Sequence, residues 1–254
     1  MHRLQVVAGI ASAGLVAASL VMGAPGGAGA SASRALAATP TPAHLWHAEG
    51  NANDSVGADN GTLVGAGFGP GVLGPDQAFR FAGGTQRVVF NKFGGNRRRG
   101  DFTFAFDIKT TATRNQAIWE KRIACNSDGT PFWDFRMGPG QISPPPRTGI
   151  IGFSLFNGQV DYFVDSTTSL NDGKWHLVVA TRHGVTLSLY VDGNLEATTT
   201  SPTAVKVIND ARMRAGVSKC DGIDGTHPFI GKLDELMIFR TAFTQAQIQA
   251  LAGG

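Results

Sequence analysis

The chain is poor in charged residues. Asp, Glu, Lys and Arg make up 16% of its 254 residues, against about 25% in an average globular protein. This charge content excludes a coiled coil or a helical bundle, because both need Glu and Lys in sustained heptads. Glycine is abundant instead, at 34 residues, and 16 Phe and 4 Trp are enough for a packed core. A fully disordered chain is therefore excluded as well, and the composition predicts short strands joined by tight turns.

The chain also lacks a broad excess of either charge. Lys and Arg number 22 and Asp and Glu 19, which gives a formal charge of +3. Two of the cations, Arg3 and Arg34, lie in the first 38 residues, which contain no acid; without them 20 cations face 19 acids, a balance of +1. Attraction to nucleic acid or to an anionic lipid surface is then not a property of the whole molecule, and we expect no nucleic-acid partner.

The first 38 residues have the pattern of an export signal. A short basic start is followed by an uncharged stretch of 17 residues, 6–22, and then by the triplets Ala28-Gly29-Ala30 and Ala35-Leu36-Ala37. Such small-x-small triplets are typical of signal-peptidase sites. The alternative is a transmembrane anchor, for which this Gly- and Ser-containing stretch is short. We expect residues 1–38 to be a signal peptide and linker, and the mature protein to be secreted, with no membrane span.

Cysteine is scarce, with only Cys125 and Cys220 present. The absence of a CxxC pair argues against a zinc ribbon and against thioredoxin chemistry. In an exported protein, two cysteines more often form a disulfide. We expect a Cys125–Cys220 bond; the alternative is two separate buried thiols.

Alternation of apolar and polar residues dominates the rest of the chain. Residues 101–110 place Phe102, Phe104, Phe106 and Ile108 on one face, the pattern of a half-buried strand. Asp192-Gly193 and Asn157-Gly158 predict type I′ hairpin turns. More than ten short strands at close spacing favour a β-sandwich. The further strands expected are 78–81, 86–90, 116–122, 131–137, 150–156, 159–164, 175–182, 185–191, 211–216 and 229–239.

Only the C-terminal end of the chain predicts a helix. Thr244 and Gln247 have the spacing of a capping box, in which the two side chains bond each other's backbone amides. Phe243 before the cap and Ile248 after it suit a hydrophobic staple.

Several motifs follow one another in an order typical of one family. They are the run Leu45-Trp46-His47-Ala48-Glu49-Gly50-Asn51, the run Asn171-Asp172-Gly173-Lys174-Trp175-His176, the run Leu189-Tyr190-Val191-Asp192-Gly193, and residues 229–236 before Phe239. Over residues 43–252 the chain resembles a laminin G-like domain of the concanavalin A-like lectin/glucanase superfamily. The resemblance implies an all-β fold in residues 39–254: a two-sheet antiparallel jelly-roll β-sandwich with a short C-terminal helix. It also implies a structural calcium ion and glycan binding.

Some members of that superfamily are glucanases, which carry two catalytic carboxylates on one strand as Glu-x-Asp-x-x-Glu. The chain has only four glutamates, Glu49, Glu120, Glu196 and Glu235, and no two lie within six positions of each other. Asp234 and Glu235 are adjacent, so that in a strand they face opposite sides of the sheet. Gly-x-Ser-x-Gly and HExxH are absent too. We therefore expect a protein that is not an enzyme.

The resemblance places the calcium ion on Glu49, Asp54 and Asp234. Calcium takes six to eight oxygen ligands, and Glu49 and Asp54 lie in an Asn- and Gly-rich loop where backbone carbonyls are plentiful. Asn51 and Asn60 are lesser candidates. The alternative is that Glu49 and Asp54 cap turns and that Asp234 makes a buried hydrogen bond or salt bridge.

Glycan recognition combines aromatic faces with a few convergent polar groups. Both kinds of residue gather in the middle of the chain, and the candidate ligand-binding residues are Trp119, Arg122, Trp133, Asp134, Arg136 and Tyr162. In the strand 131–137, Asp134 and Arg136 share a face with Phe132, opposite Trp133 and Phe135. The alternative is that Trp119 and Trp133 belong to the core, as we expect for Trp46 and Trp175.

Arg97-Arg98-Arg99 is a further candidate site, for acidic groups on a glycan; the alternative is a solvated hairpin tip. Taken together, the sequence predicts a secreted, non-catalytic protein that binds a glycan or polysaccharide. A structural or adhesion domain that binds a cell-surface or matrix protein is the first alternative, and a glycoside hydrolase of the same superfamily is the second.

Overall fold

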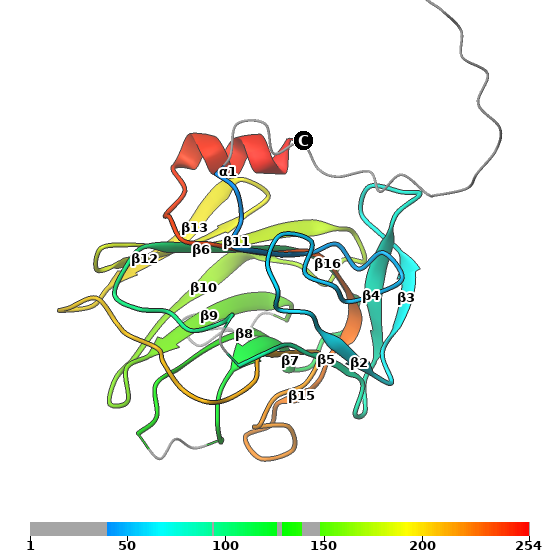
Figure 1. The fold of residues 1–254 in the computed structure, drawn as a ribbon, viewed down its shortest axis with the longest axis horizontal. Helices are drawn as coiled ribbons and strands as arrows, with labels where there is room; N and C mark the ends of the chain where they lie inside the picture. Colours follow the sequence, from blue (N-terminus) through cyan, green and yellow to red (C-terminus); the bar gives the residue numbers. More distant parts are fainter. Residues whose placement is uncertain (1–39, 93, 126–128, 139–147, 254) are drawn as a thin grey trace, which may run out of the picture. The chain divides into compact units, whose positions relative to one another are not determined.

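Two β-sheets stacked face to face make up the fold in the computed structural model, which describes residues 40–92, 94–125, 129–138 and 148–253 (Figure 1). The all-β jelly-roll sandwich is confirmed. The expected signal peptide and linker lie outside the described residues. Within the described residues, no helix has the length and apolar character needed to cross a membrane.

The first sheet, sheet A, has the order β13-β12-β11-β6-β16-β4-β3, and β1 also pairs with β16. All its pairs are antiparallel. Its strands are β1 (His44–Trp46), β3 (Gly67–Pro70), β4 (Gln77–Ala82), β6 (Phe102–Lys109), β11 (His176–His183), β12 (Thr186–Val191), β13 (Asn194–Thr200) and β16 (Ile230–Phe239).

The second sheet, sheet B, has the order β10-β9-β8-β7-β14-β5-β2. Its pairs are antiparallel except for the two-residue strand β15, which runs parallel to β7. Its strands are β2 (Thr62–Val64), β5 (Arg87–Val89), β7 (Gln116–Lys121), β8 (Phe132–Gly138), β9 (Ile150–Phe156), β10 (Asp161–Ser169), β14 (Arg214–Ala215) and β15 (His227–Pro228).

The main core fills the space between the sheets and is unusually aromatic. Phe104 from sheet A contacts the rings of Trp119, Trp133, Phe135 and Phe153, all from sheet B, at centroid distances of 4.6 to 6.0 Å. Such tilted and edge-on pairs add to the stabilisation from burial.

Two expectations about the core need correction. Strand β6 is buried on both faces rather than half-buried, because Ala105 on its other face belongs to a second cluster with Phe239 and Ile248. Helix α1 (Gln245–Ala252) supplies Ile248 and Leu251 to this cluster and so covers part of the outer face of sheet A (Figure 1). Trp175 is half-buried instead of being a core residue; Trp46 is fully buried, as expected.

The predicted helix cap is confirmed. The Thr244 hydroxyl accepts a hydrogen bond from the Gln247 amide, and the Gln247 side chain accepts one from the Thr244 amide. Phe243 and Ile248 lie in the same cluster, as a hydrophobic staple requires.

One of the two predicted hairpin turns is correct in detail. Asp192 and Gly193 both have positive φ, 49° and 81°, as a type I′ turn demands. The other hairpin has a longer connection: β9 ends at Phe156 and β10 begins at Asp161, and the Asn157 side chain accepts bonds from the amides of Gln159 and Val160. An Asx-type turn has replaced the predicted type I′ turn there.

Candidate functional site

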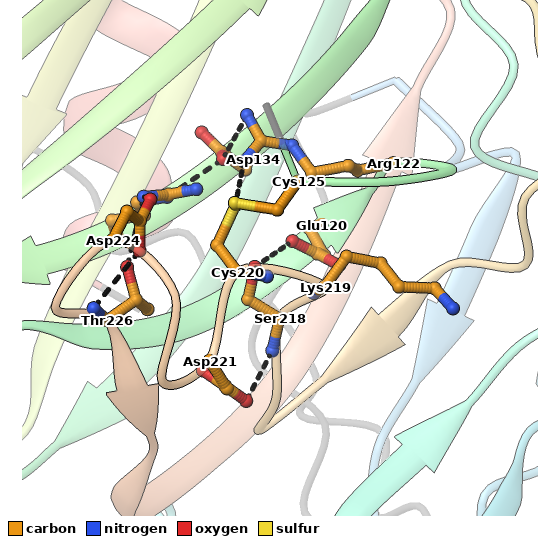
Figure 2. Close-up of a disulfide and its surroundings, with 11 residues drawn as sticks. Glu120, Arg122, Cys125, Asp134, Ser218, Lys219, Cys220, Asp221, Asp224 and Thr226 are labelled. Atoms are coloured by element: carbon orange, nitrogen blue, oxygen red, sulfur yellow. Dashed lines mark hydrogen bonds and ion pairs between the residues drawn. A yellow bond between two sulfur atoms is a disulfide. The ribbon is translucent and has the colours of Figure 1, made fainter. Parts of the chain in front are cut away.

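A disulfide fastens a loop over the outer face of sheet B. Cys125, just after β7, is bonded to Cys220, as predicted. Cys220 lies in the segment between β14 and β15, residues 216–226, which we call the disulfide loop. Figure 2 shows the loop residues Ser218, Cys220 and Asp224 beside side chains of the sheet.

The alternation in β8 decides which predicted site residues can reach this face. Trp133, Phe135 and Met137 point into the core, while Phe132, Asp134 and Arg136 point outward. Trp119 and Trp133 are 1% and 0% exposed, so the prediction that they form a sugar-stacking platform is wrong. Buried between two sheets, neither indole can meet a ligand. Tyr162 is half-buried and packs against the same core.

The predicted residues Arg122, Asp134 and Arg136 do come together on the outer face. The Asp134 carboxylate lies 3.3 Å from the Arg122 guanidinium and accepts a hydrogen bond of 2.9 Å from Arg136. Arg136 also donates to Asp224 at 2.7 Å and to the Thr226 hydroxyl at 3.0 Å. Against the effect of burial, the carboxylates of Asp134 and Asp224 raise the pKa of Arg136. These charged groups thus hold the disulfide loop against the sheet.

Glu120 on β7 makes a second anchor for the loop. Its carboxylate accepts hydrogen bonds from the Ser218 hydroxyl at 2.6 Å and the Lys219 amide at 3.0 Å, and lies 3.7 Å from Arg214. Burial and the neighbouring Asp134 raise the pKa of Glu120.

Glu120 and Asp134 face each other across neighbouring strands, but they do not form an open catalytic pair. They are 2% and 3% exposed, and their oxygens accept the bonds just described. A glycoside hydrolase needs its two carboxylates to flank the scissile glycosidic bond, whereas this pair lies under the loop.

Aromatic rings lie beside the charged network. The Arg122 guanidinium sits over the Phe132 ring, 3.5 Å from its centroid, and Phe132 stacks on Phe156 at 5.0 Å. Phe156 is half-buried, and so is Phe163, which is paired with the outward-facing Ser154. Sequence reasoning missed Phe156 and Phe163 as candidates, although the alternation within 150–156 does place Phe156 opposite the core residue Leu155.

A cavity of about 600 Å³ is lined by residues of the disulfide loop and of strands β5 and β14, and we call it the sheet B cavity. Four of its lining residues are cations: Arg87 on β5, Arg214 on β14, and the exposed Arg212 and Lys219. Ser218 and Asp221 add further polar groups. Because these residues come from three separated segments, no motif in the sequence marks the cavity.

The predicted calcium ligand Asp54 has another role. Its carboxylate accepts hydrogen bonds from the amides of Leu45, Val56, Gly57 and Asp59, and the His44 ring lies 2.7 Å away. Against the effect of burial, the His44 and backbone hydrogen bonds lower the pKa of Asp54. With its oxygens committed in this way, Asp54 organises the turn after β1, and its assignment as a calcium ligand is not supported.

Asp234 instead lies close to Asp76, which sequence reasoning missed. A Cβ placed on Gly71 would lie 2.6 Å from an Asp76 oxygen and 2.7 Å from an Asp234 oxygen. The two carboxylates therefore border one small space that is open only because residue 71 is glycine. Asp234 accepts bonds from the amides of Val72 and Glu235, and Asp76 from the amide of Leu73, so each accepts fewer amides than the four on Asp54. Burial, Glu235 and Asp76 together raise the pKa of Asp234 to about 8. Glu49 is near this site, since its carboxylate accepts a bond from the amide of Gln77, next to Asp76.

Within the described residues, one group of three potential metal-binding side chains has its ligand atoms close together: Cys125, Cys220 and Asp224. Both sulfurs belong to the disulfide, so neither offers the thiolate that a metal would bind. This group is therefore not a metal site.

Residues 82–249 of the chain match the model of a laminin G family that is described as the concanavalin A-like lectin/glucanases superfamily. No curated protein matches the chain.

Solved structures of the same fold include domain 4 of AbnA, an extracellular GH43 arabinanase from Geobacillus stearothermophilus, in complex with arabinotriose. It has a TM-score of 0.63 and 15% identity, with 83% of this chain and 98% of that chain covered. The ligand-binding domain of botulinum neurotoxin serotype D in complex with N-acetylneuraminic acid has a TM-score of 0.62 and 16% identity, with 84% and 50% covered. This chain thus spans about half of that toxin domain.

Proposed function

Since the chain belongs to the concanavalin A-like lectin/glucanase superfamily, we propose that it is a secreted, non-catalytic carbohydrate-binding domain whose saccharide lies on the outer face of sheet B. The observation that carries the proposal is the contrast between the two outer faces. Helix α1 covers part of the outer face of sheet A. The outer face of sheet B combines half-buried aromatic rings with the sheet B cavity.

The chemistry of this face suits a saccharide with acidic groups. Rings such as Phe156 and Phe163 offer apolar surface for a sugar, and convergent polar groups fix its orientation. Guanidinium groups such as those of Arg87 and Arg212 bond carboxylate and sulfate oxygens in pairs. The complexes of structurally similar domains with arabinotriose and with N-acetylneuraminic acid support a saccharide ligand.

The non-catalytic part of the proposal rests on the state of Glu120 and Asp134. A catalytic pair must reach the scissile bond, and both of these carboxylates are buried beneath the disulfide loop with arginine or hydroxyl partners. The proposal of secretion rests on the pattern of residues 1–38 and on the disulfide, because such bonds persist in oxidising compartments.

Calcium has a place in this proposal as a structural ion. Asp76 and Asp234 would hold it in the space beside Gly71, with Glu49 close by. Carboxylates and backbone carbonyls are the oxygen ligands that calcium prefers. Its contribution would be to neutralise two buried acids and so to stabilise the edge of sheet A.

The proposal is tested on a glycan array followed by calorimetric titration of the saccharides that bind. The double variant Arg212→Gln/Lys219→Gln should bind at least about tenfold more weakly, a loss of roughly 1.4 kcal/mol, and Phe156→Ala should also weaken binding. Lys206→Gln is the matched control, because Lys206 is an exposed cation that does not line the sheet B cavity.

Three outcomes would overturn parts of the proposal. A folded protein that binds no saccharide on the array would contradict the proposal of carbohydrate binding. Binding to a cell-surface or matrix protein alone would favour the adhesion alternative. Release of new reducing ends from a bound polysaccharide would show that the protein is an enzyme.

A further inference from the structure

Two arginine side chains are buried close together at one end of the sandwich. Arg97 precedes Arg98 in the segment before β6, and Arg182 lies on β11. They are 7% and 1% exposed. Arg97 is thus not part of the solvated hairpin tip considered from the sequence, although Arg98 and Arg99 are exposed.

The partners of these two arginines are backbone carbonyls and aromatic rings. Arg182 donates to the carbonyls of Val205, Arg98 and Gly100, and Arg97 donates to that of Gly94. The Arg182 guanidinium lies 4.7 Å from the centroid of the Phe102 ring. The Arg97 guanidinium lies 5.6 Å from the centroid of the Phe104 ring.

Negative charge balances this cluster only in part, through the Asp101 carboxylate near Arg182. Among the described residues, neither Arg97 nor Arg182 forms a salt bridge, and the Nε of each is buried without a hydrogen-bond partner. Burial lowers the pKa of Arg97 to about 10, and Arg240 and Arg182 contribute through repulsion. A buried donor left without an acceptor is destabilising, because the group has lost its hydrogen bonds to water.

A cavity of about 570 Å³ opens at this cluster, and we call it the arginine cavity. Arg97 lines it together with Arg98 and with Arg240, which follows β16. The remaining lining residues are His44, Gly94, Asn96, Gly100, Asp101 and Ile208.

The one carboxylate among these lining residues is already paired. Asp101 accepts from the Gly184 amide at 2.8 Å and lies 2.8 Å from the His183 ring. His44 is likewise engaged with Asp54, at 2.7 Å. Among the lining residues, the three arginines Arg97, Arg98 and Arg240 outnumber the single carboxylate of Asp101.

We propose that the arginine cavity binds an oxyanion, a carboxylate, sulfate or phosphate group. Planar guanidinium groups present paired N–H donors that match two oxygens of such a group. A bound anion would also relieve the repulsion among Arg97, Arg182 and Arg240. The site is separate from the proposed saccharide surface, because it shares no residue with the sheet B cavity.

The experiment is calorimetric titration of the full chain with sodium sulfate, at an ionic strength held constant with sodium chloride. Affinity for sulfate should fall at least about tenfold in the double variant Arg98→Gln/Arg240→Gln. Arg99→Gln is the matched control, since Arg99 is the exposed neighbour of Arg98 and does not line the cavity. Both variants leave the buried Arg97 in place, so that folding is not at issue.

The inference fails if sulfate does not bind to the unchanged chain. It also fails if Arg98→Gln/Arg240→Gln binds sulfate as tightly as the unchanged chain, or if Arg99→Gln loses as much sulfate affinity as that double variant. Parallel titrations with phosphate and with glucuronate identify which oxyanion is preferred. The variant Arg212→Gln/Lys219→Gln should keep its sulfate affinity. If Arg212→Gln/Lys219→Gln loses its sulfate affinity while Arg98→Gln/Arg240→Gln keeps it, the anion binds in the sheet B cavity and the inference fails. This outcome is independent of whether the protein binds a saccharide on the glycan array.

Discussion

Arg136 on β8 and Asp224 in the disulfide loop, 88 positions apart in the chain, form an ion pair of 2.7 Å. Arg136 in turn bonds the buried Asp134 at 2.9 Å. One guanidinium therefore joins a sheet carboxylate to a loop carboxylate. The two acids differ mainly in exposure, since the Asp224 side chain is 30% exposed and that of Asp134 is 4% exposed.

This difference predicts unequal costs for two matched substitutions. Asp134→Asn should lower the free energy of unfolding by about 3 kcal/mol, because it leaves the buried charge of Arg122 without a carboxylate; Arg136 keeps Asp224 as its partner. Asp224→Asn removes an exposed partner and should cost less than about 1 kcal/mol. Urea unfolding of both variants under one set of conditions gives the comparison, and equal losses would contradict the assigned roles.

Removal of the disulfide should destabilise the protein more than loss of the Arg136–Asp224 pair. The bond joins residues 95 positions apart, and cross-links of loops near that length contribute at most about 4.7 kcal/mol, with 2–4 kcal/mol typical. We expect Cys125→Ser/Cys220→Ser to lose about that much, measured by urea unfolding. Reduction of the unchanged protein should give the same loss. A double variant as stable as the oxidised protein would show that the contacts of Glu120 and Arg136 alone hold the loop.

Much of the sandwich could be predicted because its central strands have strong apolar alternation. In β9, for example, Ile151, Phe153 and Leu155 belong to the core between the sheets and alternate with Gly152 and Ser154. Strand β13 was missed because it is largely exposed and has no apolar face to detect. Strand β3 was missed because Gly67, Gly69 and Pro70 weaken any strand prediction.

The candidate site was less predictable, because alternation separates two faces of a strand without saying which is inside. It correctly places Asp134 and Arg136 opposite Trp133, yet it gives no reason to prefer the core over a ligand for the tryptophan ring. Asp76 and the cations of the sheet B cavity depend on contacts between segments far apart in the chain. Such contacts leave no local pattern.

Calcium should stabilise the protein through Asp234 and not through Asp54. At a calcium concentration one hundred times the dissociation constant, the gain in unfolding free energy would be about 2.7 kcal/mol. Asp234→Asn should abolish the rise in melting temperature that calcium causes. Asp54→Asn, which removes the turn acceptor, should lower the melting temperature equally with calcium and with chelator. Stabilisation by calcium that persists in Asp234→Asn would show that Asp234 does not bind the ion. No stabilisation of the unchanged protein by calcium would contradict the proposal of a structural calcium ion.

The charge of His176 should make stability depend on pH. Its Nδ1 lies 2.7 Å from Asp192 and its Nε2 3.0 Å from Asp172, whose other oxygen is 3.4 Å from Lys174. The Asp192 hydrogen bond, opposed by burial and aided by Asp172, raises the pKa of His176 above 6.5. The backbone amide of Lys174 and the His176 ring lower the pKa of Asp172 to about 2, and against the effect of burial His176 lowers that of Asp192.

The sign of the effect follows from these directions. A raised histidine pKa contributes stability that is complete below pH 6.5 and is lost as pH rises through the folded-state value. The lowered aspartate pKa values contribute stability above about pH 4, lost only in stronger acid. His176→Gln should therefore cost more at pH 5.5 than at pH 8.5, by at most about 1 kcal/mol because the carboxylates are exposed. Thermal unfolding of His176→Gln and of the unchanged protein at the two pH values gives the comparison. Equal losses for His176→Gln at both pH values would mean that its ring acts by packing and neutral hydrogen bonds, without a pH-dependent charge.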